Sequence, residues 1–375
     1  MAPAPLRDRL EAAAHDLGLD AFGVAPAEAS PRAADLLAHL AAGRHADMEW
    51  LARDPHRRAD PRLVLPGARS VIVVALSYFT SDPPPALWND PLRGRVARYA
   101  WGRDYHNVLG KLLRKLALVL AREAPGVNWR AYADTGPVME HDTALRAGLG
   151  FTGKTTLLRA ILGLEALKNP LLLHPSRGSY LHLGVILTDA DLDPDPPAAT
   201  DGGAVWRKGN ALRSCGACVR CQDACPTRAF PVPYVLDARR CIAYHTIENR
   251  GDIPEELRPG FGNWIFGCDE CQSVCPWVRK FSTPGRTRYI EPDPDRMAPA
   301  LPDLLALDDD AFFRRYAGTP LMRAKRRGLQ RNALVALGNS RRPEALPLAL
   351  AHASNPDPLL ATHASWAVRR LEESA

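Results

Sequence analysis

The sequence predicts a mixed α/β fold, followed by a cysteine-rich segment and a helical C-terminus. Strand-like apolar runs alternate with helical patterns before residue 200, all eight cysteines lie between positions 215 and 275, and a weak helical repeat follows. The expected boundaries are 1–200, 205–290 and 295–375. A chain of 375 residues is long enough for two or three such domains.

The first part alternates between the two kinds of secondary structure. Apolar runs rich in β-branched residues indicate buried strands, and a period near 3.6 indicates helices. The stretch 191–204, rich in Pro, Asp and Gly, is interpreted as a linker. The expected elements are helices at 6–42 (with a break at 17–23), 108–123 and 138–147, and strands at 68–78, 129–134 and 181–188.

The charge of the chain is concentrated near its C-terminal end. A net charge of +6 and 24% charged residues are ordinary for a globular protein. Between positions 310 and 331, however, the only acid is Asp310, against the basic residues Arg314, Arg315, Arg323, Lys325, Arg326, Arg327 and Arg331. This segment indicates a polyanionic partner, with a solvated helical face as the alternative.

The C-terminal repeat pairs residues 331–338 with 363–370, at a separation of 32 residues. Small residues interleaved with apolar ones at such a period are typical of paired HEAT-like helices. Two copies are few for this kind of repeat. We expect a helical C-terminal domain of this type.

The cysteines form two runs with ferredoxin spacing. Cys215, Cys218, Cys221 and Cys225 make a complete CxxCxxCxxxCP run, Cys268, Cys271 and Cys275 make an incomplete one, and Cys241 lies between them. In such runs the fourth cysteine ligates the other cluster. We therefore expect one 4Fe–4S cluster on Cys215, Cys218, Cys221 and Cys275, and another on Cys225, Cys241, Cys268 and Cys271. The alternatives are structural zinc, which does not need this spacing, and disulfides, which would be unusual so crowded.

Several features indicate where the protein is located and to which class it belongs. The early Arg7 is followed by no signal-peptide pattern, and no run of 18 apolar residues indicates a membrane helix. With the crowded cysteines, this predicts a cytoplasmic protein. Gly148–Thr155 matches the P-loop pattern GxxxxGK(S/T), but a P-loop follows a buried strand and this motif follows an expected helix, so nucleotide hydrolysis is not favoured.

Asp134 is the candidate acid. It ends a short expected strand and precedes Thr135-Gly136-Pro137, at an edge of the sheet where ligands bind in α/β folds. Near a bulky apolar cofactor, a carboxyl group would have a raised pKa and could deliver a proton. The alternative is that Asp134 caps the following helix.

The chain resembles the epoxyqueuosine reductases, the cobalamin-dependent iron–sulfur enzymes that complete queuosine in tRNA. The resemblance covers nearly the whole sequence, including both cysteine runs and Glu140. Its other motifs are ARYAWGRDYH (97–106), YADTGP (132–137), GLGFTGKT (148–155), DARRCIAYHTIE (237–248), IPEELR (253–258), GCDECQ (267–272), CPW (275–277) and RAKRRGLQRNA (323–333).

The resemblance implies that cobalamin lies between the N-terminal domain and the cluster domain, and that the epoxide oxygen leaves as water. Asp134 matches the proton donor of the family. The implied cobalamin contacts are Arg58, Tyr99, Asp134, Lys154, Thr155, Ser179 and Gln272. The implied tRNA contacts are Arg323, Lys325, Arg326, Arg327 and Arg331. Two departures lie near the pocket: Thr155 stands where the family usually has Asn, and residues 158–175 look like an insertion.

Two other interpretations compete. A reductive dehalogenase would share the cobalamin and both clusters, but such enzymes usually carry a twin-arginine signal, which is absent here. An electron-transfer or scaffold protein would have no use for a pocket around Asp134. The expected protein is a monomer that takes its electrons from an unidentified donor.

Overall fold

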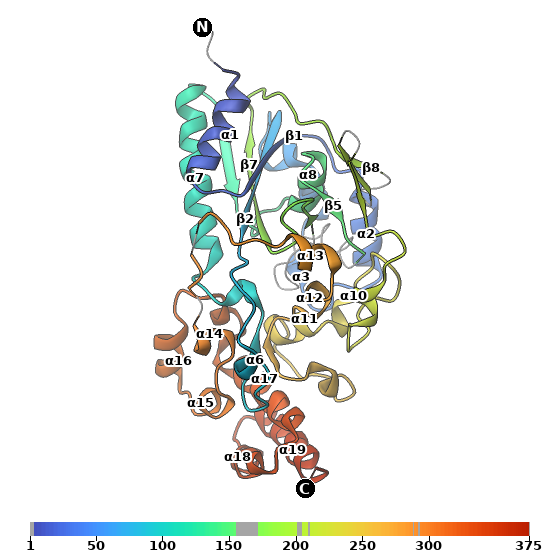
Figure 1. Ribbon diagram of the computed structural model, residues 1–375, viewed down its shortest axis with the longest axis vertical. Coiled ribbons are helices and arrows are strands. Elements are labelled where there is room, and N and C mark those ends of the chain that lie inside the picture. The colour runs from blue at the N-terminus through green and yellow to red at the C-terminus, as the bar shows by residue number, and fades with distance from the viewer. Residues whose placement is uncertain are drawn as a thin grey trace.

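The computed structural model describes residues 4–154, 172–200, 205–208, 211–287, 289–291 and 293–374. In Figure 1, a sheet flanked by helices forms the upper half of the molecule, and the C-terminal helices form the lower half. The short helices of the cysteine-rich segment lie on the right, between these halves. The predicted mixed α/β class is confirmed.

A four-stranded antiparallel sheet forms the N-terminal core, in the order β1-β2-β7-β4. Its strands are β1 (Ala21–Pro26), β2 (Ser70–Ser77), β7 (Leu181–Thr188) and β4 (Trp129–Tyr132). Strands β2 and β7 are buried along their whole length, which explains their continuous apolar sequences. The three predicted strands are all present.

Strand β1 is the one strand of this sheet that the sequence did not predict. The expected break at 17–23 is only a short turn, after which the chain pairs with β2 from Ala21 onwards. The strand contains Gly23 and ends at Pro26, so its sequence has little strand propensity. Its conformation therefore depends on pairing at the edge of the sheet.

Helices cover both faces of the sheet (Figure 1). Helices α1 (Leu6–Asp16) and α7 (Tyr105–Glu123) cover one face, and α8 (Glu140–Arg146) packs on the other. Gly184 of β7 allows the close approach of α7, because a Cβ there would lie 2.8 Å from Leu113 Cδ1. The expected helix before the P-loop-like motif is α8.

Short elements connect the sheet to the cysteine-rich segment and build that segment. The helices are α2 (Ala33–Ala41), α3 (Glu49–Ala52), α4 (Pro55–Ala59), α5 (Pro61–Val64), α6 (Pro85–Trp88), α10 (Arg220–Asp223), α11 (Ile242–Ile247), α12 (Glu270–Ser273) and α13 (Pro276–Phe281). The strands are β3 (Arg95–Val96), β5 (Phe151–Thr152), β6 (Leu172–Leu173), β8 (Ala199–Thr200), β9 (Val205–Lys208), β10 (Ala211–Ser214) and β11 (Trp264–Phe266).

The C-terminal region is helical, as predicted. It contains α14 (Pro294–Met297), α15 (Leu301–Leu305), α16 (Asp309–Tyr316), the 3-10 turn η5 (Pro320–Ala324), α17 (Lys325–Ser340), α18 (Leu346–Ala353) and α19 (Pro358–Glu372). The two repeat segments lie in α17 and α19, which pack together where Gly338 meets the Trp366 ring. One cluster of buried apolar side chains extends from Leu10 to Leu371, so the three parts share a continuous core. Within the described residues, no helix has the length and apolar character needed to cross a membrane.

Candidate active site and cysteine centre

Asp134 follows β4 in a backbone conformation that few residues other than glycine adopt. Its φ is +67°. Its N–H donates to Oε1 of Glu140 at 2.8 Å, and the Tyr105 hydroxyl donates to its Oδ2 at 3.1 Å. Helix α8 begins only at Glu140, after Met139 as its N-cap residue. Asp134 is therefore not a helix cap, and its side chain is directed elsewhere.

Asp134 lines a cavity of about 650 Å³. Two arginines lie in its walls: Arg58 donates from Nη1 to the Gly136 carbonyl at 3.3 Å, and Arg323 pairs with Glu248 through two hydrogen bonds of 2.8 Å. The walls come from the start of α7, the turn after β4, the end of α11, η5, and the segment from α3 to α4. The cavity lining thus combines the carboxyl groups of Asp104, Asp134 and Glu248 with two guanidinium groups.

The carboxyl groups of Asp134 and Glu140 form a largely buried pair. Burial raises the pKa of Asp134 well above its ordinary value, and the nearby Glu140 carboxylate raises it further, against the opposing charge of Arg58. Burial also raises the pKa of Glu140 to about 8, although the Asp134 N–H and Arg58 favour its charged form. The pair therefore holds a proton near neutral pH, which Asp134 can deliver into the cavity.

Aromatic rings hold the acid from the side of α7. The ring of Tyr105 stacks on His182, with centroids 4.0 Å apart, and on His106, at 4.3 Å. His106 lies between two carboxylates, with Nδ1 2.6 Å from Asp104 Oδ1 and Nε2 3.7 Å from Asp134 Oδ2. These contacts fix the orientation of the carboxyl group and connect it to a further titratable residue.

The residues expected to bind cobalamin do not all meet in this cavity. Arg58 and Asp134 line it, whereas the buried Tyr99 packs edge-on against Tyr105. The Ser179 hydroxyl donates to Gln272 Oε1 at 3.0 Å, and both residues are 1% exposed.

In the turn before the expected insertion, the side chain of Lys154 is bonded within the protein. Lys154 donates from Nζ to the Gly216 carbonyl at 2.7 Å, beside the first cysteine run. Thr155 and most of the 158–175 insertion lie outside the described residues. Within the described chain, the fully buried Thr152 hydroxyl has no hydrogen-bond partner. A buried hydroxyl of this kind suits an amide-bearing ligand such as cobalamin.

Sequence reasoning assigned no role to Glu140, Tyr105, His106 or Glu248. A signal for Glu140 was present, because the polar run Glu140-His-Asp-Thr143 precedes apolar residues in a short helix. The side chains of residues 140–143 are all buried. Buried polar groups need a structural or chemical reason. The role of Glu248 depends on a contact across 75 positions with Arg323, which no local pattern reveals.

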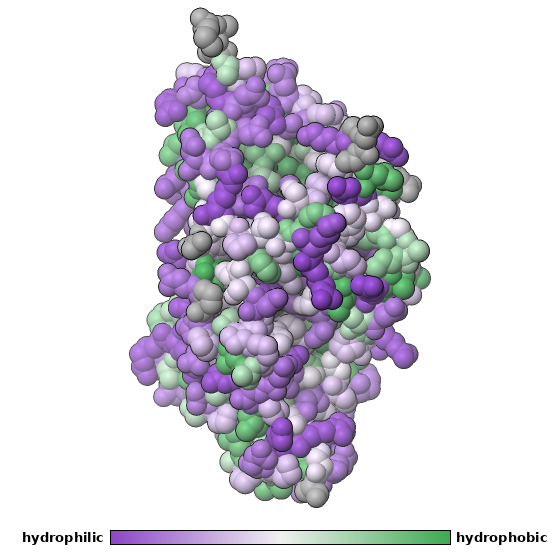
Figure 2. Space-filling view, in the orientation of Figure 1, coloured by the Kyte–Doolittle hydropathy of each residue, from purple (hydrophilic) through white to green (hydrophobic). Residues whose placement is uncertain are grey.

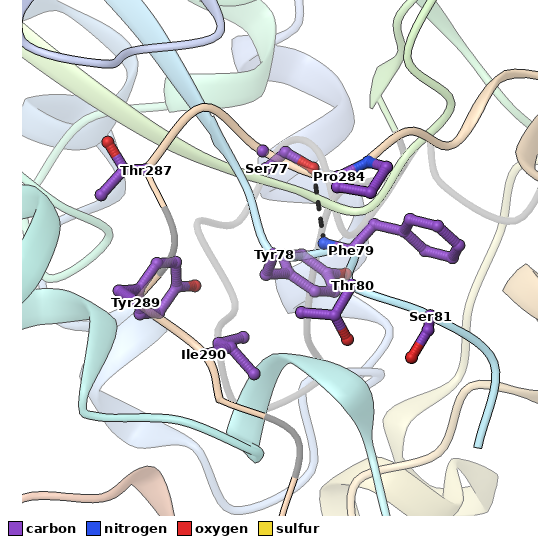
Figure 3. A pocket seen from close by; sticks show the side chains of 10 residues that line it. Ser77, Tyr78, Phe79, Thr80, Ser81, Pro284, Thr287, Tyr289 and Ile290 are labelled. Carbon is purple, nitrogen blue, oxygen red and sulfur yellow. Dashed lines mark hydrogen bonds between the residues drawn. The ribbon is translucent and has the colours of Figure 1, made fainter. Parts of the chain in front are cut away.

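A second cavity, of about 230 Å³, lies between the end of β2 and residues 284–290 (Figure 3). Figure 3 shows the rings of Tyr78 and Tyr289 on its walls, and the hydrogen bond from the Phe79 N–H to Ser77 Oγ. Its wall is joined to the Ser179–Gln272 pair, because the Tyr78 hydroxyl donates to Gln272 Oε1 at 3.5 Å. No Asp, Glu, His or Lys is among its described lining residues. The cavity around Asp134 is therefore the candidate active site.

The first expected set of cysteines is close together. Burial raises the pKa of Cys215, and the nearby Cys275 and Cys218 thiols raise it further. Burial raises the pKa of Cys221 to about 12, with added repulsion from the Cys215, Cys275 and Cys218 thiols. These four thiols are partly exposed, and none is in a disulfide. A positively charged iron centre would supply the stabilisation that four adjoining thiolates need.

The second set is more buried. Cys241 and Cys271 are each 6% exposed. Burial raises the pKa of Cys268 well above its ordinary value, with added repulsion from Cys271 and Cys241. The Cys225 sulfur accepts a hydrogen bond from the Ala229 N–H at 3.3 Å, and its place in this set remains a prediction. Among the described residues, no three Cys, His, Asp or Glu side chains converge on a point suited to a single metal ion.

The basic residues expected to bind tRNA are mostly engaged within the protein. Arg323 pairs with Glu248, Arg326 with Asp309 and Arg327 with Asp357, while Lys325 begins α17. Each of the three paired arginines keeps part of its side chain exposed.

Arg331 corrects the prediction. It is 1% exposed, and its guanidinium donates to the carbonyls of His245, Asn249 and Gly251. Its position on the inner face of α17 places it in the core, so it is not available to a phosphate. The sequence showed only its charge, not the side of the helix that it occupies.

Comparisons with known proteins identify relatives of this chain. Residues 58–135 match the family described as epoxyqueuosine reductase QueG, DUF1730, and residues 214–278 match the 4Fe-4S double cluster binding domain. The epoxyqueuosine reductase of Escherichia coli K12 is 37% identical, over 94% of this chain and 86% of the relative.

Two solved structures are also similar. One is an epoxyqueuosine reductase with an epoxyqueuosine-modified tRNA-Tyr stem loop, 29% identical, with a TM-score of 0.83 over 98% of this chain and 90% of the other. The second is the Bacillus subtilis epoxyqueuosine reductase with its catalytic aspartate loop swung out of the active site, 28% identical, with a TM-score of 0.81 over the same shares of each chain. From the length and identity of these matches, the chain belongs to the epoxyqueuosine reductase family.

Proposed function

We propose that this chain reduces the epoxide of epoxyqueuosine in tRNA to the alkene of queuosine, with Asp134 as the proton donor. The observation that carries the proposal is the carboxyl group of Asp134, kept protonated by burial and by Glu140 at the wall of a cavity with two arginines. The substrate follows from the family and from the similar structure with an epoxyqueuosine-modified tRNA stem loop.

The chemistry requires an acid at this place. Opening an epoxide leaves charge on its oxygen, and that oxygen departs as water only after it receives protons. The hydrogen bond from Tyr105 and the one to Glu140 hold the Asp134 carboxyl group in position. His106, beside it and paired with Asp104, is placed to return a proton after turnover. A similar reductase has its catalytic aspartate loop in a second position, which suits an acid carried on a short, strained turn.

Electrons reach the site through two 4Fe–4S clusters, with one set of ligands at Cys215, Cys218, Cys221 and Cys275 and the other at Cys225, Cys241, Cys268 and Cys271. When bound, cobalamin supplies a strongly reducing metal centre for carbon–oxygen bond cleavage. The proposed contacts are Arg58, Tyr99, Asp134, Ser179 and Gln272, with Lys154 and Thr155 at the adjoining turn. Thr152 joins this list because its buried hydroxyl has no described partner.

The remaining expectations complete the proposal. The three parts at 1–200, 205–290 and 295–375 serve as catalytic, cluster and HEAT-like tRNA-binding regions. The exposed parts of Arg323, Lys325, Arg326 and Arg327 contact the tRNA backbone. The protein acts as a monomer in the cytoplasm, a reducing compartment in which cysteine thiols stay available to bind iron.

The test is queuosine formation on epoxyqueuosine-tRNA by the Asp134→Asn variant, after anaerobic loading with iron and cobalamin and with dithionite as reductant. Asparagine keeps the shape but cannot deliver the proton, so turnover should fall by about 10²–10⁴-fold. Iron content and tRNA affinity should match those of the parent. Turnover at the parent rate would remove Asp134 from the chemistry, and a parent enzyme that acts on organohalides but not on tRNA would overturn the proposed substrate.

A further inference from the structure

The surface around the first cysteine set has an unusual charge balance. We call it the cluster face and define it as the described residues within 205–232 and 276–283. Asp223 is its only acid, against the basic residues Arg207, Lys208, Arg213, Arg220, Arg228, Arg279 and Lys280. All of these except Arg213 are exposed.

The basic side chains of the cluster face are not neutralised by the protein. Among the described residues, none of the seven forms an ion pair with a carboxylate. The contrast with Arg323, Arg326 and Arg327, each paired with an acid, is direct. Arg213 instead lies over the Trp277 ring at 5.7 Å, and this contact joins β10 to α13 in one surface. The face therefore presents positive charge outward.

Apolar side chains are exposed among these charges. Leu212 is 50% exposed, Val219 39% and Val232 53%. Figure 2 shows hydrophobic surface at the right edge of the molecule, and strongly hydrophilic side chains nearer the centre of the view. Exposed apolar side chains among charged ones are typical of protein–protein interfaces, whereas RNA backbones are bound by charge and hydrogen bonds.

The two cysteine sets differ in their surroundings. Val219 and Arg220 lie between ligands of the first set, whose four thiols are partly exposed. In the second set, Cys271 precedes Gln272, which bonds to Ser179, and Cys241 precedes α11, whose last residue lines the cavity around Asp134. The first set is thus the more exposed of the two, and the second adjoins residues that lead to the cavity around Asp134.

We infer that the cluster face is the docking site of a small acidic protein that carries single electrons at low potential. The inference rests on the proposed function, which needs an electron source. Reduction of the epoxide to an alkene and water consumes two electrons and two protons. Two encounters are needed per turnover: in each, the carrier loses one electron and the cluster on the first cysteine set gains one. Opposite charges speed such encounters and make them sensitive to salt.

The experiment measures the rate at which an acidic flavodoxin hydroquinone reduces the clusters of the iron-loaded protein, by anaerobic stopped-flow spectroscopy at several ionic strengths. The variant is Lys208→Glu with Lys280→Glu, and the matched control is Arg122→Glu, an exposed arginine near the end of α7. In the double variant, we expect the second-order rate constant for cluster reduction by flavodoxin to fall at least tenfold at low salt and to approach the parent value at high salt. The control should behave as the parent does.

Three further measurements interpret the result. Iron content and cluster reduction by dithionite should be unchanged in the variant, and so should dithionite-driven turnover on tRNA, which reports on the proposed function alone. An unchanged rate with flavodoxin would overturn the inference. A loss of tRNA affinity with an unchanged flavodoxin rate would assign the surface to RNA instead.

A second variant covers the case in which the double variant loses iron. Arg207→Gln with Lys208→Gln lies outside the cysteine runs and should still slow cluster reduction by flavodoxin about threefold. No slowing would overturn the inference.

Discussion

The cavity around Asp134 and the cluster face hold their charges in opposite ways. In the cavity, carboxyl and guanidinium groups are held by hydrogen bonds, and the proposed acid Asp134 is largely buried. On the cluster face, basic side chains extend into solvent without acidic partners among the described residues. Charge in the cavity sets protonation and position, and charge on the face sets encounter rates. Substitutions in the cavity should therefore have large effects on turnover that do not depend on salt. Substitutions on the cluster face should have smaller effects on the rate of electron transfer, and high salt should remove them.

The largest effect should come from the second cysteine set, which links the two regions. Cys271→Ala removes a thiol from this set. We expect the iron content to fall from about 8 to about 4 atoms per chain, with complete loss of queuosine formation even with dithionite. Iron analysis and electron paramagnetic resonance would check this. A variant that keeps all its iron would remove Cys271 from the ligands, and Ser273→Ala, two positions away, is the matched control.

Glu140 tests whether the cavity depends on fixed geometry. Glu140→Ala removes the acceptor for the Asp134 N–H, so the strained turn should lose its position and turnover should fall about 100-fold. Glu140→Gln keeps an acceptor oxygen and should restore most of the rate. Equal rates for the two variants would show that the hydrogen bond does not position the acid.

The pH profile of the same variants tests the charge of the pair. Asp134 acts while protonated, so turnover should be high below the raised pKa of the pair and should fall as the pH rises through it. Glu140→Gln removes a negative neighbour and so lowers the pKa of Asp134. The decline should then begin at a lower pH than in the parent. A decline at the same pH, or at a higher one, would contradict the proposed coupling.

Arg331 tests whether a buried charge in the C-terminal region is structural. Arg331→Met leaves three buried carbonyls without their donor, and the free energy of unfolding should fall by about 3 kcal/mol. Denaturant titration would measure it, with Arg370→Met on α19 as the control. If the stability were unchanged but tRNA binding weakened, the original prediction of a phosphate contact would be restored.

The smallest effect should come from Arg326 and Arg327, whose charges are partly balanced by Asp309 and Asp357. Changing both to Glu should weaken tRNA binding about tenfold and reduce its salt dependence. A salt titration of tRNA affinity would show both changes. Unchanged affinity over the whole titration would remove this segment from the interface.

The sequence predicted the elements and motifs whose signals are local. Buried strands β2 and β7 have continuous apolar runs, and the cysteine spacing is specific enough to indicate two clusters. Strand β1 was missed because its pairing with β2 is a tertiary contact. The burial of Arg331 and the partnership of Glu248 with Arg323 depend on contacts between distant segments, so charge alone gave the wrong role for Arg331 and none for Glu248.

Helix α11 has a consequence for how the enzyme could work as a unit. Cys241 lies at its first end, Ile247 at its last end lines the cavity, and Arg331 and Asn332 fasten its carbonyls to α17. This helix of 6 residues thus extends from Cys241 to the cavity, and hydrogen bonds join it to the C-terminal region, which is proposed to bind RNA. A shift of α17 on RNA binding would therefore also move α11. Such a movement would change the distance between the second cysteine set and the cavity around Asp134.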